Sequence, residues 1–142
     1  WGENVYVKIP IVNSQGLSSV PLINTLTRRM QLNVTAVFGL IGDKEIIPKR
    51  SMIVSIFAGR IADTGRDPAR FFNHAINAEY LWASTREVFN IFQAEKAGAD
   101  IITISPDLFR KYESMEGKDL QEYSMETVKQ FYDDAQASGF VL

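Results

Sequence analysis

The chain has 142 residues, enough for one domain with a hydrophobic core, and its hydrophobic (46%) and charged (23%) fractions are ordinary for a globular protein. Its net charge of -2, with acidic and basic residues interspersed, does not favour a nucleic-acid partner or an anionic membrane surface. The chain has no cysteine, which excludes disulfides and thiolate chemistry and fits the cytoplasmic location that we predict, and no apolar run is long enough to predict a membrane span.

A single histidine, His74, narrows the chemistry further. A His-rich metal site is excluded, and a nucleophile activated by histidine would have to use His74. We therefore predict no metal and no cofactor. If the protein is an enzyme, then lysine, arginine, carboxylate or hydroxyl groups carry its chemistry.

Strand-like apolar runs recur along the chain, separated by helical or turn-rich segments. The predicted strands are Val5–Pro10, Leu32–Phe38, Met52–Phe57, Tyr80–Ser84 and Asp100–Ser105. This alternation favours βα units with a parallel sheet in a single domain.

The predicted helices rest on apolar periodicity and on capping residues. Helical periodicity predicts helices over Leu17–Met30, Thr85–Ala97 and Ser124–Ser138, with Gly98 and Gly139 ending the last two. The segment STRE predicts a capping box between Ser84 and Glu87, and Ser105 with Pro106 predicts a further helix start. Two connections, Gly39–Ser51 and Arg70–Asn77, look too short or too poor in helix formers for full crossovers.

Side chains alternate along a strand, and each predicted strand has one apolar face and one face with polar groups. The polar faces are predicted to hold Tyr6 and Lys8; Asn33, Thr35 and Val37; Ser55; Tyr80, Trp82 and Ser84; and Thr103 and Ser105. A (β/α) barrel turns one strand face into its lumen, whereas a doubly wound sheet covers both faces with helices. The pattern therefore favours a barrel. Each polar residue alone could equally be satisfied by backbone hydrogen bonds.

Lys8 interrupts the apolar run VYVKIP, and lysine is rarely buried in a strand unless it is paired or functional. A lysine whose ammonium group reaches solvent at the strand end, near Pro10, is the structural alternative. A desolvated lysine loses affinity for its proton, and the neutral amine can form a Schiff base with a carbonyl substrate.

Arginines follow the third and fourth predicted strands, in FAGRIADTGRDP and WASTRE. Arginine forms bidentate contacts with phosphate, and a helix amino terminus adds donors, so Arg60, Arg86 and Ser84 are candidates for a phosphate site. The alternative is that Arg60 and Arg66 form surface ion pairs with Asp63 and Asp67.

Taken together, the segments VYVKIP, LNVTAVF, VSIFAGRIADTGRDP and LWASTRE resemble the transaldolase family, whose members are class I aldolase-type (β/α)8 TIM barrels. The resemblance extends from about Val5 to the carboxyl-terminal helix. It implies that Lys8 is the catalytic residue that forms a Schiff base with a ketose phosphate. It also implies that the substrate is bound by Asn33, Thr35, Ser55, Arg60, Ser84 and Arg86.

The resemblance also implies that only the portion from strand 4 to strand 8 is present, so residues 1–142 would form one partial barrel of five βα units and a carboxyl-terminal helix. The family's acid/base aspartate, a second asparagine and a water-positioning glutamate come from the first three strands and cannot be assigned here. Because five strands cannot close an eight-stranded barrel, we expect a part of a longer protein that is inactive on its own.

The activity implied is that of a transaldolase of the pentose phosphate pathway. Such an enzyme transfers a dihydroxyacetone unit between sugar phosphates, from sedoheptulose 7-phosphate and glyceraldehyde 3-phosphate to erythrose 4-phosphate and fructose 6-phosphate. Two alternatives stay open: a fructose-6-phosphate aldolase-type lyase, and a non-catalytic fragment that binds sugar phosphate or assembles with a partner supplying the missing strands. The resemblance also predicts a homo-oligomer.

Overall fold

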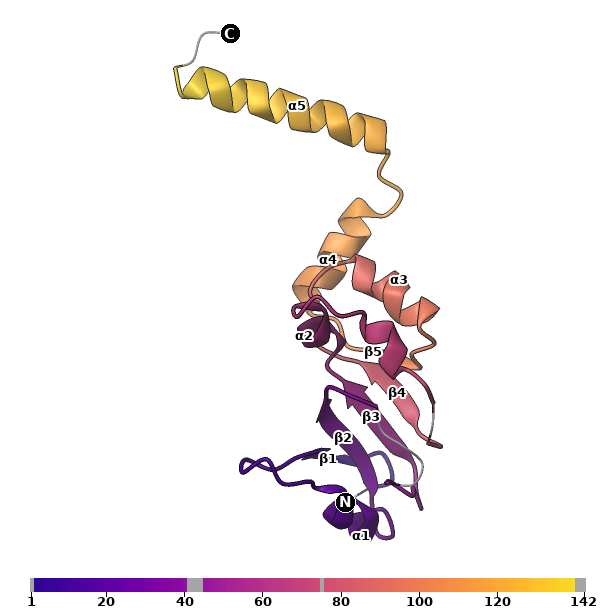
Figure 1. Ribbon diagram of the computed structural model, residues 1–142. Coiled ribbons are helices and arrows are strands. Elements are labelled where there is room, and N and C mark those ends of the chain that lie inside the picture. Colours follow the sequence, from indigo (N-terminus) through magenta and orange to yellow (C-terminus); the bar gives the residue numbers. More distant parts are fainter. Residues whose placement is uncertain (1, 41–44, 75, 140–142) are drawn as a thin grey trace. The chain divides into compact units, whose positions relative to one another are not determined.

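The computed structural model describes residues 2–40, 45–74 and 76–139, and its sheet has five strands in the order β1-β2-β3-β4-β5. All neighbouring pairs are parallel, as the arrows in Figure 1 show. The strands are β1 (Tyr6–Pro10), β2 (Gln31–Val37), β3 (Met52–Ile56), β4 (Glu79–Trp82) and β5 (Ile101–Ile102). The predicted α/β class is confirmed, and this open parallel sheet is consistent with part of a TIM barrel.

Helical elements lie between the strands and after them. They are α1 (Val20–Leu26), α2 (Ala58–Ala62), the 3-10 helix η1 (Pro68–Phe71), α3 (Phe89–Lys96), α4 (Pro106–Met115) and α5 (Leu120–Ala137). The two thin crossovers are confirmed where they are described: residues 45–51 contain no helix, and the connection from β3 to β4 holds only α2 and η1. Residues 41–44 of the first crossover lie outside the described residues.

Two predicted elements are shorter in the structure, for identifiable reasons. The first helix does not begin at Leu17, because Ser18 forms an antiparallel bridge with Val12 before α1. The last strand stops at Ile102 instead of Ser105. Its partner β4 ends at Trp82, so only one further backbone bond, from Thr103 N to Trp82 O (3.0 Å), extends the pairing.

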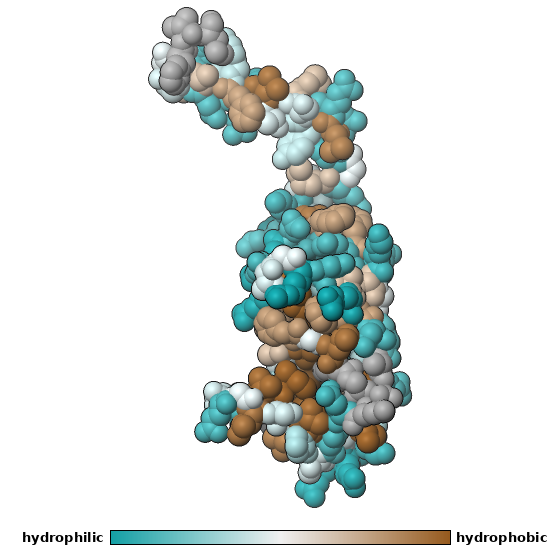
Figure 2. Space-filling model, viewed as in Figure 1, coloured by the Kyte–Doolittle hydropathy of each residue, from teal (hydrophilic) through white to brown (hydrophobic). Residues whose placement is uncertain are grey.

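One face of the sheet carries the hydrophobic core. Val34, Val54 and Trp82, on β2, β3 and β4, pack with Ile23 of α1 and Ala94 of α3 in one buried cluster. Helices α1, α2 and α3 therefore cover this face, as the apolar strand faces predicted. Apolar side chains also stay at the surface over the strand region, as the brown patches in Figure 2 show.

The pairing register corrects two predicted strand faces. Ser55 is opposite Leu81, so Tyr80 and Trp82 lie on the core face with the apolar residues of β3 and not on the polar face. The β2–β3 register shifts between Val34 and Val37, which puts Val37 opposite Ile56, also on the core face. Such an irregularity adds a residue to one strand and reverses the alternation beyond it.

The chain divides into two units, Trp1–Phe109 and Arg110–Leu142. In the second unit, the Asp119 carboxylate caps α5 by accepting from the backbone N–H groups of Gln121 and Glu122, and Gly139 follows with φ 80°. The predicted last helix is confirmed with an earlier start. None of the described helices is both long enough and apolar enough to cross a membrane.

Candidate active site

Lys8, Asn33 and Ser55 lie on three consecutive strands, on the sheet face opposite the core. Lys8 of β1 is directly opposite Asn33 of β2 in the register, and adjacent strands lie about 5 Å apart. The Ser55 hydroxyl donates to Asn33 Oδ1 at 2.6 Å. The fold therefore brings together three of the predicted site residues.

Thr35 extends this polar face toward the carboxyl end of β2, opposite Pro10. Its Oγ1 is buried and has no hydrogen-bond partner among the residues that the structure describes. An unsatisfied buried hydroxyl costs about 1–3 kcal/mol, which a ligand oxygen or a water would recover. The face becomes apolar beyond β3, where Leu81 and Ile101 are aligned with Ser55.

Lys8 itself is exposed, so of the two alternatives the described residues show the lysine whose side chain reaches solvent and not the buried one. The physical reason is that β1 is an edge strand, paired on one side only, by β2. The position of Lys8 beside Asn33 is what connects it to the polar face.

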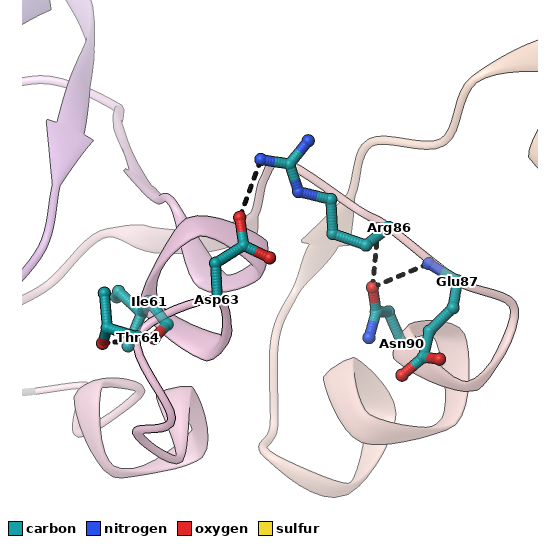
Figure 3. A network of polar contacts seen from close by, with 6 residues as sticks. All are labelled: Ile61, Asp63, Thr64, Arg86, Glu87 and Asn90. Atoms are coloured by element: carbon teal, nitrogen blue, oxygen red, sulfur yellow. Dashed lines mark hydrogen bonds and ion pairs between the residues drawn. The ribbon is translucent and has the colours of Figure 1, made fainter.

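The loops that follow β3 and β4 meet at the carboxyl ends of these strands. Gly59 N–H donates to Ala83 O at 3.4 Å, and a Cβ built on Gly59 would lie 1.6 Å from Ser84 O. Arg86 forms an ion pair with Asp63 at 3.0 Å, as Figure 3 shows. The predicted convergence of the two loops is confirmed.

The arginines of these loops do not form the surface ion pairs that the sequence offered as an alternative. The Asp63 carboxylate contacts Arg86, and the Asp67 carboxylate accepts from the backbone N–H of Ala69 at the start of η1. Arg60 lies over the Phe57 ring, 5.1 Å from its centroid, and Arg66 donates to the Thr64 hydroxyl. Both carboxylates thus have other partners, which leaves the guanidinium of Arg60 on an aromatic face.

The predicted capping box at Ser84 and Glu87 is wrong. Ser84 has a φ of 66°, and α3 begins later, at Phe89. The Asn90 side chain holds the loop before α3 instead. Its Oδ1 accepts from the backbone N–H groups of Arg86 (2.8 Å) and Glu87 (3.2 Å), as Figure 3 shows. Asn90 therefore fixes the backbone on which Arg86 is carried.

Replacing Asn90 with alanine is expected to lower the free energy of unfolding by about 1–3 kcal/mol, because two backbone donors lose their acceptor at a residue that is only 4% exposed. The Asn90 side-chain N–H also donates to Gln93 Oε1 at 2.8 Å, so Gln93→Ala, which removes only this second bond, serves as the matched control. Urea denaturation followed by circular dichroism measures both. Equal losses in the two variants would contradict the role of Oδ1.

His74 lies away from the polar face. It comes before β4, and its Nε2 donates to Gly98 O at 2.8 Å, beside the loop before β5. The roles of Gly59 and Asn90 in shaping the loops were not predicted, and Asp63 was expected only as a surface partner of Arg60 or Arg66. Only Gly59 carried a signal, because a glycine directly after a strand often marks a close backbone approach.

A family model described as transaldolase/fructose-6-phosphate aldolase matches residues 1–141. The chain belongs to this family. The open parallel sheet is consistent with part of the TIM barrel of this family.

Curated members of the family resemble the chain over most of its length. It is 33% identical over 120 residues to a probable transaldolase 2 of Listeria monocytogenes, which covers 78% of this chain and 53% of that protein. It is 30% identical to a probable transaldolase of Streptococcus equi subsp. zooepidemicus, over 78% of the chain and 54% of that protein. A probable transaldolase of Methanococcus maripaludis is 32% identical over 118 residues, which cover 77% of this chain and 53% of that protein. The chain spans about half the length of these relatives.

Proposed function

We propose that this chain carries the Schiff-base lysine and the phosphate-holding loops of a transaldolase, which moves a dihydroxyacetone unit between sugar phosphates of the pentose phosphate pathway. The observation that carries the proposal is the row formed by Lys8, Asn33 and Ser55 across three strands. The arginine-bearing loops after β3 and β4 support it, because they meet at the strand ends where a substrate phosphate would lie.

In the proposed reaction, the neutral amine of Lys8 attacks the C2 carbonyl of a ketose phosphate, and loss of water forms the imine. The C4 hydroxyl gives its proton to a base, the C3–C4 bond breaks with its electron pair passing to the protonated imine, and an aldose phosphate leaves. The dihydroxyacetone unit stays on Lys8 as an enamine. Its carbon then attacks the aldehyde of a second aldose phosphate, and hydrolysis of the new imine frees the amine.

Asn33 and Thr35 would bind the hydroxyl groups of the sugar. Ser55 donates to Asn33 Oδ1, which fixes the orientation of that amide and leaves its N–H groups available to sugar oxygens. The unpartnered hydroxyl of Thr35 gains a partner when substrate binds. Both side chains lie on the Lys8 side of the sheet, so their hydrogen bonds would hold the reacting carbons near the amine.

Arg60, Ser84 and Arg86 would hold the phosphate. The side chains of Arg86 and Asp63 are 52% and 55% exposed, and exposed ion pairs contribute about 0–1 kcal/mol. A doubly charged phosphate can therefore compete with Asp63 for the guanidinium. Arg60 lies over the Phe57 ring, and its guanidinium has several N–H groups with which to contact a phosphate.

Borohydride reduction in the presence of fructose 6-phosphate tests the proposal, because it converts the imine into a stable secondary amine. We expect the protein to gain the mass of a reduced sugar-derived adduct, and peptide mapping to place it on Lys8. Lys8→Ala should not gain the adduct, whereas Lys96→Ala, which removes a lysine of α3, should gain it as the wild type does. Absence of any adduct, or an undiminished adduct in Lys8→Ala, would contradict the assignment.

The same lysine would serve a fructose-6-phosphate aldolase, the second activity in the family's description. An assay for free dihydroxyacetone released from fructose 6-phosphate, without an aldose phosphate acceptor, distinguishes the aldolase from the transaldolase. A transaldolase keeps the unit on Lys8 until an aldose phosphate arrives, so we expect little free dihydroxyacetone in that assay.

A further inference from the structure

A hollow of about 850 Å³ lies at the end of the sheet opposite the candidate active site. Its lining comes from the amino ends of three consecutive strands: residues 2–7 at β1, 29–31 at β2, and 50–51 just before β3. Parallel strands bring these segments together, since Leu32 is opposite Met52. The Gln31 side-chain amide donates to the Glu3 carbonyl, which ties the first segment to the second. The volume is within the range of small-molecule sites.

Two arginines line this hollow with unpaired guanidinium groups. The backbone N–H of Arg29 donates to Leu26 O, but neither the Arg29 nor the Arg50 guanidinium makes an ion pair or hydrogen bond with any of the residues that the structure describes, and both residues are exposed. One carboxylate, Glu3, lines the hollow with them, so its side chains carry a formal net charge of +1. Two unpaired guanidinium groups in one concave site attract an anion that can accept several N–H groups.

The other residues that line the hollow indicate that the bound anion has an apolar organic part. Val5, Val7 and Met30 are partly buried and present apolar surface in the same hollow, and Ser51 also lines it. A bare inorganic ion would leave this apolar surface in contact with water. An organic anion would cover it, because removing apolar surface from water is favourable.

We propose that this hollow binds a small organic phosphate, with Arg29 and Arg50 on the phosphate and Val5, Val7 and Met30 against its apolar body. The site is distinct from the loops that carry Arg60 and Arg86. Those loops follow the carboxyl ends of β3 and β4, whereas the hollow lies at amino ends. The ligand of the hollow is therefore not the reacting substrate. It binds at the amino-terminal ends of the strands, where TIM barrels do not place their catalytic groups.

Isothermal titration of the full chain with phenyl phosphate, and separately with inorganic phosphate, tests the proposal. We expect saturable binding of phenyl phosphate that depends on Arg29 and Arg50, separate from any phosphate held by the loops that carry Arg60 and Arg86, with inorganic phosphate binding at least several-fold more weakly. Arg29→Gln and Arg50→Gln should each weaken phenyl phosphate binding by about tenfold, the loss of one charge-assisted contact. Glu3→Gln should strengthen it, because the only carboxylate of the hollow is removed.

Two control variants locate the site. Arg28→Gln removes the neighbouring exposed arginine that does not line the hollow, and Arg60→Gln removes a candidate substrate contact at the other strand ends. Arg28→Gln should bind phenyl phosphate as the wild type does, and Arg60→Gln should keep the binding that Arg29→Gln weakens. The proposal is overturned if the wild type shows no saturable binding, if Arg28→Gln loses as much affinity as Arg29→Gln, or if Arg60→Gln abolishes binding. Equal affinity for both phosphates overturns the apolar half of the site. Circular dichroism of each variant verifies that it folds.

Discussion

Replacing Gly59 with alanine is expected to lower the free energy of unfolding by about 3 kcal/mol, at the upper end of the usual range for overpacking. The new Cβ would lie 1.6 Å from Ser84 O, 2.8 Å from Ser84 C and 3.1 Å from Arg86 Cγ. The first two of these are backbone atoms, which cannot rotate away as the end of a flexible side chain can. The start of α2 and the loop after β4 must therefore separate.

Gly39→Ala is the matched control. Gly39 also follows a strand, but a Cβ there meets none of the described residues within 4 Å, so its effect should stay within about 0.5 kcal/mol. Urea denaturation followed by circular dichroism compares the two. If Gly59→Ala were as stable as Gly39→Ala, the close approach of the two loops would not exist in solution.

Gly59→Ala also bears on the proposed function. The separation that it forces would pull Asp63, which follows α2, away from Arg86 and would disturb the backbone at Ser84. Both phosphate candidates of the second loop would then lose their positions relative to Arg60. Borohydride trapping with fructose 6-phosphate should therefore weaken in any Gly59→Ala protein that still folds, although Lys8 is unchanged.

The order and direction of the strands could be predicted from the sequence, because short apolar runs separated by helical segments leave few ways to build a parallel sheet. Alternation along single strands was enough to place Lys8, Asn33 and Ser55 on one face. Their neighbourhood follows from pairing between strands that are consecutive in the chain. These elements depend on local patterns, which a sequence displays directly.

Features that depend on the pairing of strands could not be predicted in this way. The phase of β4 against β3 decides whether Trp82 or Leu81 lies beside Ser55, and a shift of one residue exchanges the two faces. Ala36 lies between Val34 and Val37, where the β2–β3 register shifts, and has a positive φ of 56°. No glycine stands at this position to indicate in the sequence that the backbone is irregular. Likewise α3 has no side-chain cap at its start, and the loop before it is held by Asn90, inside the helix, and not by Ser84.

Replacing Trp82 with alanine is expected to lower the free energy of unfolding by about 3–5 kcal/mol. Trp82 is 1% exposed and lies opposite Ile56 on the core face of the sheet. Its ring stacks on Phe72 with centroids 5.1 Å apart and an interplanar angle of 19°. Truncation leaves a cavity between β4 and the segment after η1, and aromatic pairs of this kind contribute about 0.5–1.5 kcal/mol beyond the area they bury.

Trp82→Phe separates the contribution of the ring from that of the indole N–H. The Nε1 atom is buried and has no hydrogen-bond partner among the described residues, so phenylalanine keeps the stacking and loses no bond. We expect it to cost less than half as much as alanine. Denaturation must be followed by circular dichroism, since both variants change the fluorescence. Equal losses in the two variants would mean that Nε1 does donate to a partner, so that the indole N–H would not be an unsatisfied donor in this core. A small loss in Trp82→Ala would instead place the indole outside the core, and with it the phase of β4 that sets Leu81 beside Ser55.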